Sequence, residues 1–519
     1  MDSARSKTVG HVFVVKADVT TIDCDAWLCP TDPDFHVTAG FASAVGLSQE
    51  GCLEEMSWDD AAVPFNPKHT RPLIVLGNVG NYEAKSPHDV EHQVSKLKPV
   101  VKAFVRIAIE YCCVPNSELP LRLALPLIGT GQGGLRGAKG DTIKPLLSTL
   151  TDLAREHNID LVLCTREDLA WSAVQAARDQ TARDGWELFD VEEQLAQHLA
   201  EAARADRLVL FIGAGVSSDA GLPGWQALLD SLRPALPKDQ QELLQKVDLR
   251  DQAALIQAEI GGRKKFLEKI TETLRQHQRI GLTHALLASL GVREAVTTNY
   301  DQLYERARDH RAAGIGERPT VLPYGRVAEN SPWLLKLHGC ISQPDHIVIT
   351  RSDYLRLARE RSALFGIVQA LLLTKHSLFV GYSLADDDFH QLVEEIRIMT
   401  DLSKPRHPLG TVLAIEDWPL ADLWTDVLDV HRVGDGLPAP SSRRLQILLD
   451  RVAHLSAPKD LHLLDESFNG LLDAADVDIA ASLRELRKKA ARVIEQLPDH
   501  PTARAVERML ERFTGTEEP

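Results

Sequence analysis

Short apolar runs alternate with helical stretches along the first 180 residues of the chain. The runs are rich in β-branched and aliphatic residues and read HVFVVKADV, PLIVLGNVG, LRLALPLIG and DLVLCT. Runs of this kind, separated by helical stretches, are typical of the strands of a mostly parallel sheet. The pattern therefore predicts an α/β domain over residues 1–182.

A second α/β pattern covers residues 187–436. A stretch with apolar residues at helical spacing, 189–206, leads into the apolar run RLVLFIGAG. The later runs are EAVTTNY, WLLKLHG, SLFVGYS and TVLAIE. We expect these runs to form a doubly wound sheet of the Rossmann type, with helices on both faces.

The last part of the chain has a helical pattern. A Pro- and Ser-rich linker, GDGLPAPSS at 434–442, precedes it, so we expect a helical region over 443–519. One face of the stretch VDIAASLRELRKKAARVIEQL carries the apolar residues Ile479, Leu483, Leu486, Ala490, Val493 and Leu497. Pro498 and Pro501 break this helix before a last one that ends at Phe513. Either the amphipathic tail packs against its own chain, or it is an assembly or partner helix.

Composition and charge are those of a soluble globular protein. Hydrophobic residues make up 44% and charged residues 25% of the chain, and 58 Lys and Arg against 74 Asp and Glu give a net charge of -16. A broad nucleic-acid surface needs a clustered basic face, so we do not expect nucleic acid as a partner. The most apolar later stretch, ALFGIVQALLLTKHSLFVGYSL, carries Lys375 and His376 at its centre and indicates a buried helix and strand instead of a membrane span.

The cysteines and the N-terminus favour a cytoplasmic protein. The seven cysteines include no C-x-x-C pair, so the zinc-ribbon pattern is absent from the sequence and we expect no metal. Their odd number, and the short apolar core of the N-terminal MDSARSKTVGHVFVV, argue against secretion. We therefore expect reduced thiols, a cytoplasmic location and no membrane partner.

The stretch LVLFIGAGVSSDAGLPGW, residues 208–225, is an apolar run that passes into glycines and then small polar residues. Gly213 and Gly215 would let a pyrophosphate approach the backbone, and the N–H groups that follow favour negative charge. Ser217 could add a hydroxyl donor. The next glycine, Gly221, does not fit the G-x-G-x-x-G fingerprint of dehydrogenases. The loop indicates either a phosphate cradle or a tight turn that binds no ligand.

Polar residues also follow three later apolar runs. They are Thr298, Asn299 and Asp301 in TTNYD, His338 in KLHG, and Gly381, Ser383 and the run Asp386–Asp388 in GYSLADDDF. Because parallel strands end at one edge of a doubly wound sheet, we expect these residues to meet the glycine loop at one crevice. The alternatives are a hydrogen-bonded structural role for His338, a turn or cap role for Asn299, and solvation of a helix N-terminus by the aspartates.

Taken in order, GAGVSSDAGLPGW, TTNYD, KLHG and GYSLADDDF resemble the sirtuin-like domains of bacterial anti-phage proteins, as in the Thoeris and defence-associated sirtuin groups. The resemblance covers about half of the chain and implies that NAD is the substrate. It implies that the NAD phosphates are held by Gly213, Ala214, Gly215 and Ser217. It places the nicotinamide ribose near Asn299, Asp301 and His338, includes Thr298 among the NAD contacts, and places the adenosine near Gly381 and Ser383.

The chain departs from deacetylating sirtuins in two respects. Those enzymes carry a four-cysteine zinc module beside the active site, and none can be built from these cysteines. Where they have Asp-Phe-Arg in their glycine loop, this chain has Gly224 and Trp225. Both differences resemble the defence branch, whose members hydrolyse NAD. The resemblance therefore implies cleavage of NAD without a metal.

Cleavage of the nicotinamide–ribose bond passes through an oxocarbenium-like state, so the site must fix the ribose and offer a base. His338 is the expected base, because an imidazole titrates near neutral pH. Asn299 is both a donor and an acceptor, which suits orienting a water or the ribose hydroxyls. Asp301 would either stabilise the developing positive charge or hold its loop.

Two stretches of the N-terminal domain resemble a macro domain, the ADP-ribose-binding α/β fold. They are VVKADVTTIDCDAWLCPTD at 14–32 and ALPLIGTGQGGLRGAKGDTIKPLL at 124–147. The resemblance implies a nucleotide- or ADP-ribose-like ligand with the contacts Asp18, Gly129, Thr130, Gly131, Gly133 and Gly134. Pro30-Thr31-Asp32 and HVTAGFASAVG replace that family's paired asparagines and glycine loop. The alternative is a degenerate structural or oligomerising domain.

Together the resemblances imply an NAD glycohydrolase that releases nicotinamide and ADP-ribose and depletes NAD in anti-phage defence, by abortive infection. Its N-terminal domain would sense a nucleotide or regulate the enzyme, and a phage protein is a further candidate trigger. A homo-oligomer is the expectation for the family. Two alternatives stay open: a sirtuin-type protein ADP-ribosyltransferase, and a non-catalytic NAD or ADP-ribose sensor that recruits a partner.

Overall fold

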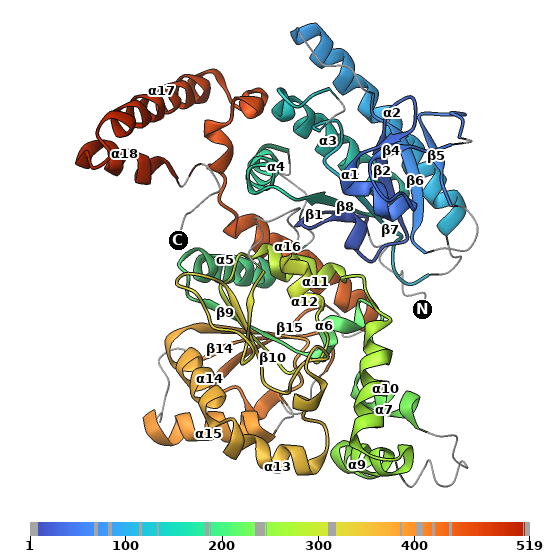
Figure 1. Ribbon diagram of the computed structural model, residues 1–519, viewed down its shortest axis with the longest axis vertical. Helices are drawn as coiled ribbons and strands as arrows, with labels where there is room; N and C mark the ends of the chain where they lie inside the picture. Colours follow the sequence, from blue (N-terminus) through green and yellow to red (C-terminus); the bar gives the residue numbers. More distant parts are fainter. Residues whose placement is uncertain are drawn as a thin grey trace. The chain divides into compact units, whose positions relative to one another are not determined.

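The computed structural model describes residues 9–54, 56–66, 71–80, 86–113, 117–131, 134–181, 186, 188–233, 244, 246–309, 318–384, 387–400, 408–417, 421–434, 438–511 and 513 (Figure 1). The chain divides into two compact units. The first unit combines Met1–Leu188 with Ala457–Pro519, and the second combines Phe189–Asp309 with Gly316–Ser456. The first unit is therefore made from both ends of the chain, and the second is inserted between them.

The first unit is built on a mostly parallel sheet. Its described strands lie in the order β1 (Val12–Lys16), β8 (Asp160–Thr165), β7 (Arg122–Pro126), β2 (Ala26–Thr31), β6 (Leu73–Asn78) and β5 (Ala62–Pro64). Among these pairings only that of β5 with β6 is antiparallel. Strand β8 is buried along its whole length, as expected of an inner parallel strand covered on both faces. The predicted α/β architecture is confirmed for this unit.

Long helices connect the parallel strands of the first unit. They are α2 (Pro87–Cys112), α3 (Lys139–His157) and α4 (Asp168–Thr181). Helix α3 packs beside α2 and α4 (Figure 1). Shorter elements follow the first two strands, namely η1 (Val19–Thr21), β3 (His36–Val37), α1 (Ala39–Ala42), η2 (Ser43–Val45) and β4 (Gly51–Cys52).

The C-terminal part of the first unit packs against α3 and α4. It consists of η5 (Leu461–Leu464), η6 (Glu466–Leu471), α17 (Ala474–Gln496) and α18 (Pro501–Glu511). The Phe468 ring of η6 is fully buried, and the Gly140 backbone in α3 comes so close that a Cβ there would lie 2.6 Å from the Phe468 carbonyl oxygen. The Lys144 ammonium donates to the Leu471 carbonyl at 3.1 Å, and the Ser172 hydroxyl of α4 bonds His462 at 3.0 Å. These contacts fix the chain beyond residue 456 to the N-terminal sheet domain.

The second unit contains a parallel sheet with β9 near its centre. The described strands lie in the order β11 (Thr320–Leu322), β12 (Trp333–Lys336), β10 (Glu294–Thr297), β9 (Leu208–Ile212), β13 (His376–Val380), β14 (Gly410–Ala414) and β15 (Leu428–Arg432). Every pairing in this sheet is parallel, and every residue of β9 is buried. The predicted parallel sheet of residues 187–436 is thus present.

Helices cover both faces of this sheet (Figure 1). On one face α5 (Asp190–Arg204) and α11 (Leu282–Ser289) pack against α16 (Pro438–Ser456), and on the other lie α14 (Ser362–Thr374) and α15 (Asp387–Thr400). A separate apolar cluster joins α7 (Trp225–Leu232), α9 (Leu249–Ile260) and α10 (Arg263–Arg275). The remaining described elements are α6 (Ala214–Ser218), α12 (Leu303–Arg308), η3 (Pro344–His346), α13 (Arg351–Glu360) and η4 (Ala421–Leu423).

The helical region predicted as one tail over 443–519 is shared between the two units. Helix α16 belongs to the second unit, where Arg444 pairs with Glu192 and Arg451 with Glu193, each at 2.6 Å. Residues from 457 onward belong to the first unit. On α17 the expected apolar face is only partly covered, since Ala490 is buried but Ile479 is exposed. Helical periodicity identified the helices, but it did not contain the information about which domain each one packs against.

We expect Phe468→Ala to lower the stability of the first unit by about 3–5 kcal/mol, because it removes a buried ring and leaves a cavity. Hydrogen exchange of the α3 amides would measure this free energy of opening. Ile479→Ala is the matched control; this side chain is 59% exposed, and its removal should change the stability by less than about 0.5 kcal/mol. Equal losses in the two variants would contradict the packing described for η6.

Candidate active site

The carboxyl ends of β9, β10, β12 and β13 surround a cavity of about 500 Å³ in the second unit. All the residues predicted to bind or cleave NAD line it: Gly213, Ala214, Gly215, Ser217, Thr298, Asn299, Asp301, His338, Gly381 and Ser383. Four motifs separated by up to 170 residues are thus brought to one place by the parallel sheet. The structure confirms their proximity, and the role of each residue stays a prediction.

Glycines are required at this cavity because two loops come into backbone contact. A Cβ at Gly213 would lie 2.1 Å from the Gly381 carbonyl oxygen, and one at Gly381 would lie 2.5 Å from the Val216 nitrogen. Gly381 also has a φ of +60°, a left-handed backbone conformation that is unfavourable for residues with a Cβ. The N–H groups of Gly213 and Gly215 donate to the Val380 and Gly381 carbonyls, each at 3.0 Å. These glycines therefore lock the loop after β9 onto the loop after β13.

Asn299, Ser217 and Asp301 form a hydrogen-bonded chain. The Asn299 amide nitrogen donates to the Gly213 carbonyl at 3.0 Å and to the Ser217 hydroxyl at 3.2 Å. The Ser217 hydroxyl donates to Asp301 Oδ2 at 2.9 Å, and Asp301 Oδ1 accepts from the Leu303 N–H at the start of α12. Both bonds of Asn299 use its nitrogen, so Oδ1 is the atom that can accept from a ribose hydroxyl or a water. Of the two roles left open for Asp301, this geometry favours holding the loop.

A histidine that the sequence did not single out also faces Ser217. His284 Nε2 of α11 lies 3.4 Å from the Ser217 hydroxyl, and the ring is buried. Burial lowers the pKa of His284, and the negative charges of Asp301 and Asp219 oppose this shift only in part. The imidazole is therefore neutral at neutral pH. The neutral His284 ring can hydrogen-bond the Ser217 hydroxyl and hold it in place, but it does not form an ion pair with Asp301.

His338 is held by an aromatic cluster. Its Nδ1 lies 3.4 Å from the Tyr354 hydroxyl, and the two rings meet edge to face with centroids 5.1 Å apart. The Tyr354 ring in turn stacks on Trp225, whose indole N–H is buried without an acceptor in the described part of the chain. With Nδ1 facing Tyr354, Nε2 is the nitrogen that can take a proton from a reacting group. Trp225 is the last residue of the motif GAGVSSDAGLPGW, whereas Tyr354 belongs to no strand-end motif.

A buried lysine connects the strand that precedes His338 to the loop that carries Asn299. Lys336 is completely buried, pairs with Glu305 of α12 at 3.0 Å, and donates to the carbonyls of Asp301 and Asn299. Burial lowers the pKa of Lys336, but the negative charges of Glu305 and other neighbours raise it by more, so the pKa is raised overall. The ammonium group is therefore charged, and it ties β12, the TTNYD loop and α12 together.

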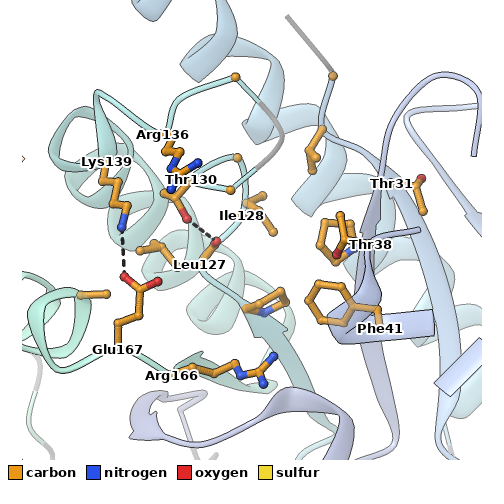
Figure 2. Close-up of a pocket in the computed structure, with 18 of the residues that line it drawn as sticks. Thr31, Thr38, Phe41, Leu127, Ile128, Thr130, Arg136, Lys139, Arg166 and Glu167 are labelled. Carbon is orange, nitrogen blue, oxygen red and sulfur yellow. Dashed lines mark hydrogen bonds and ion pairs between the residues drawn. The ribbon is translucent and has the colours of Figure 1, made fainter. Parts of the chain in front are cut away.

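A second cavity, of about 960 Å³, lies in the first unit at the carboxyl ends of β2, β7 and β8 (Figure 2). Of the predicted ligand loop, Gly129, Thr130, Gly131 and Gly134 line it, and Gly133 lies outside the described residues. Asp18 is not part of the lining; it accepts from the Thr20 N–H at 3.0 Å and lies 3.4 Å from Arg166.

Three cationic side chains line this second cavity. Arg136, Lys139 and Arg166 all line it, and Lys139 pairs with Glu167 at 2.9 Å (Figure 2). Phe41 also lines the cavity, near Arg166, since a Cβ at the neighbouring Gly40 would lie 3.1 Å from the Arg166 Nη1. A cavity lined by cations and an aromatic ring suits an anion that carries a flat ring. No local sequence pattern distinguishes these three cations, because isolated basic residues are ordinary on a surface.

Within the described ranges, no group of His, Cys, Asp or Glu could hold a metal ion. A search of the same residues finds no helix long and apolar enough to cross a membrane. Of the aspartates in GYSLADDDF, Asp386 lies outside the described residues, and Asp387 begins α15.

We expect Gly381→Ala to destabilise the second unit by about 1–3 kcal/mol or more, because the methyl group would clash with the glycine loop at a left-handed φ. Thermal unfolding measures the loss. Gly366→Ala, inside α14 with no atom within 4 Å of the added methyl, should instead leave stability unchanged or raise it. A tolerated alanine at 381 would show that the two loops can separate.

We expect Lys336→Met to cost about 3–5 kcal/mol, since it leaves Glu305 as a buried carboxylate without its cation. The double variant Lys336→Met with Glu305→Leu should recover a large part of this loss, because no unpaired charge then stays buried. Hydrogen exchange at the β10 and β12 amides would measure both. A double variant as unstable as the single one would indicate that the lysine acts through its carbonyl contacts alone.

Parts of this chain are similar to a known protein family and to named proteins. Residues 293–424 match the model of a family described as a SIR2-like domain. The chain is 28% identical over 261 residues to the NAD(+) hydrolase ThsA of Enterococcus faecium, covering 49% of this chain and 52% of that protein. It is 26% identical over 222 residues to the NAD(+) hydrolase ThsA of Acinetobacter baumannii, covering 42% of this chain and 45% of the relative.

A further relative is Defense-associated sirtuin 2 of Bacillus subtilis, with 24% identity over 207 residues, 39% of this chain and 20% of that protein. The chain thus spans about half the length, or less, of these relatives. The matched range 293–424 contains Asn299 and His338. Part of the second unit, residues 293–424, is accordingly similar to a SIR2-like domain, and the chain is similar to proteins named as NAD hydrolases and as a defence-associated sirtuin.

Proposed function

We propose that the second unit hydrolyses NAD at the nicotinamide–ribose bond and releases nicotinamide and ADP-ribose. The observation that carries this proposal is the meeting of Asn299 and His338 with the glycine loop in one cavity. The names of the relatives support cleavage of NAD, and the products are part of the proposal. Protein ADP-ribosylation and NAD sensing without turnover are the competing outcomes.

Each residue has a chemical task in this proposal. The His338 Nε2 accepts a proton from the attacking water or from a ribose hydroxyl, while Tyr354 fixes the other ring nitrogen. The Asn299 Oδ1 orients that water or hydroxyl, because its amide nitrogen is anchored to Gly213 and Ser217. Asp301 holds both the serine and the start of α12 in place. The aromatic and aliphatic wall of the cavity limits access of bulk water to the oxocarbenium-like state.

We further propose that this activity depletes NAD in anti-phage defence, by abortive infection, and that the first unit regulates it. The name of the Bacillus subtilis relative supports a defence role. The cations and the Phe41 ring that line the first unit's cavity support a nucleotide-like ligand there. A phage protein as trigger and a homo-oligomer are further parts of the proposal.

We expect the purified protein to consume NAD and to form equal amounts of nicotinamide and ADP-ribose, measured by chromatography. His338→Ala should lower kcat by roughly a hundred- to ten-thousandfold, the usual loss on removal of a general base. Asn299→Ala should lose comparable activity because the attacking group is no longer oriented. His390→Ala, an exposed histidine on α15, is the matched control and should retain full activity.

Three results would oppose the proposal. Transfer of ADP-ribose to a protein acceptor would favour the transferase, and binding of NAD with no turnover in the presence of phage-infected lysate and candidate nucleotides would favour the sensor. Full activity in both site variants would place the chemistry elsewhere in the chain.

A further inference from the structure

The cavity of the second unit has a single source of fixed positive charge. Of the described residues that line it, Arg250 alone carries a positive charge that does not titrate near neutral pH. The diphosphate of a dinucleotide substrate is anionic, and a guanidinium offers the planar pair of donors that fits phosphate oxygens. Arg250 comes from α9, which none of the strand-end motifs includes.

Arg250 is oriented toward the cavity by two contacts. Its Nε and Nη2 donate to the two carboxylate oxygens of Asp248, at 2.9 and 2.8 Å, in a paired arrangement beside the start of α9. Its guanidinium also lies 5.5 Å from the centre of the Tyr354 ring, the same ring that faces His338. The side chain is thereby held against the aromatic cluster of the site.

The remaining corner of the guanidinium is occupied by a weakly held carboxylate. Arg250 Nη1 donates to Asp387 Oδ2 at 2.6 Å, and the Asp387 side chain is 74% exposed whereas that of Arg250 is 19% exposed. Ion pairs with an exposed partner contribute little to stability, so such a partner is readily replaced. Asp387 follows the Gly381–Ser383 segment closely in the sequence, and that segment lines the cavity.

We infer that Arg250 is a phosphate-binding residue of this site, and that Asp387 occupies its free corner until the diphosphate of the dinucleotide replaces the carboxylate. This inference rests on the proposed function and adds a residue and a competing anion to it. Asp248 keeps its two bonds throughout, so the guanidinium does not have to reorient when the substrate enters. Asp387 thereby competes with the phosphate groups of the substrate for the same guanidinium.

The test is a double-mutant cycle on the KM for NAD, with Arg250→Gln and Asp387→Asn. Arg250→Gln should raise KM by roughly ten- to hundredfold, the usual effect of losing a charged hydrogen bond, with kcat little changed. Asp387→Asn should lower KM severalfold in the parent and have little effect in the Arg250→Gln background. Arg250→Lys should restore part of the affinity.

Arg351→Gln is the matched control. Arg351 also pairs with Asp248, at 3.3 Å, but it does not line the cavity, so its loss should leave KM unchanged. Inorganic pyrophosphate should compete with NAD in the parent and much more weakly in Arg250→Gln. If the two single variants change KM in the same direction, or if pyrophosphate competes equally with both proteins, Arg250 acts as a structural clasp and the inference is wrong.

The inference can fail separately from the proposed function. If the parent binds NAD without turning it over, Kd from calorimetry replaces KM in the same cycle, and the lack of turnover counts against the proposed hydrolysis alone. An unchanged Kd in Arg250→Gln would overturn the assignment of Arg250 in either case. Thermal unfolding of each variant shows whether the fold is intact.

Discussion

The charged ammonium of Lys336 is the group on which the arrangement of the site depends. A lysine buried this completely is tolerated only because a carboxylate and two backbone carbonyls surround it. Those partners belong to α12 and to the loop that carries Asn299, whereas the lysine itself lies on the strand that leads to His338. The ion pair therefore ties together the two segments that carry the side chains proposed for the chemistry, in addition to the direct pairing of β10 with β12. The glycine contact between Gly213 and Gly381 does the same for the other pair of loops, by steric means.

The parts of the fold that the sequence predicted are those with a local signal. Buried parallel strands are apolar along their length, so β9 and β13 could be recognised as runs, and their polar ends followed from the geometry of a parallel sheet. Tyr354 and Arg250 could not be found in this way, and the motif that ends at Trp225 did not indicate that this ring contacts Tyr354. The three residues lie on α13, α9 and α7, and their contacts at the cavity depend on how these helices pack, which no local pattern encodes.

The C-terminal region also shows that local sequence patterns do not encode how helices pack. Amphipathic spacing correctly predicted helices beyond residue 443. An apolar helix face indicates that the face is buried, but it does not indicate which element of the protein buries it. Helix α16 is bound to α5 through two arginine–glutamate pairs, whereas η6 inserts Phe468 beside Gly140 of α3. Both outcomes depend on residues more than 200 positions away in the sequence. The cavity of the first unit shows the same limit, since Arg136, Lys139 and Arg166 are recognised as a group only once the fold places them around one cavity.

The insertion of the second unit within the first has a consequence for biosynthesis. A ribosome makes the N-terminal sheet first, but the segment that covers α3 and α4 is translated only after the entire second unit. The second unit can therefore complete its fold while the first still exposes the apolar surface that Phe468 later fills. Domains generally fold as units during synthesis. The second unit, which carries the proposed catalytic site, can therefore be folded for some time before the first unit is complete.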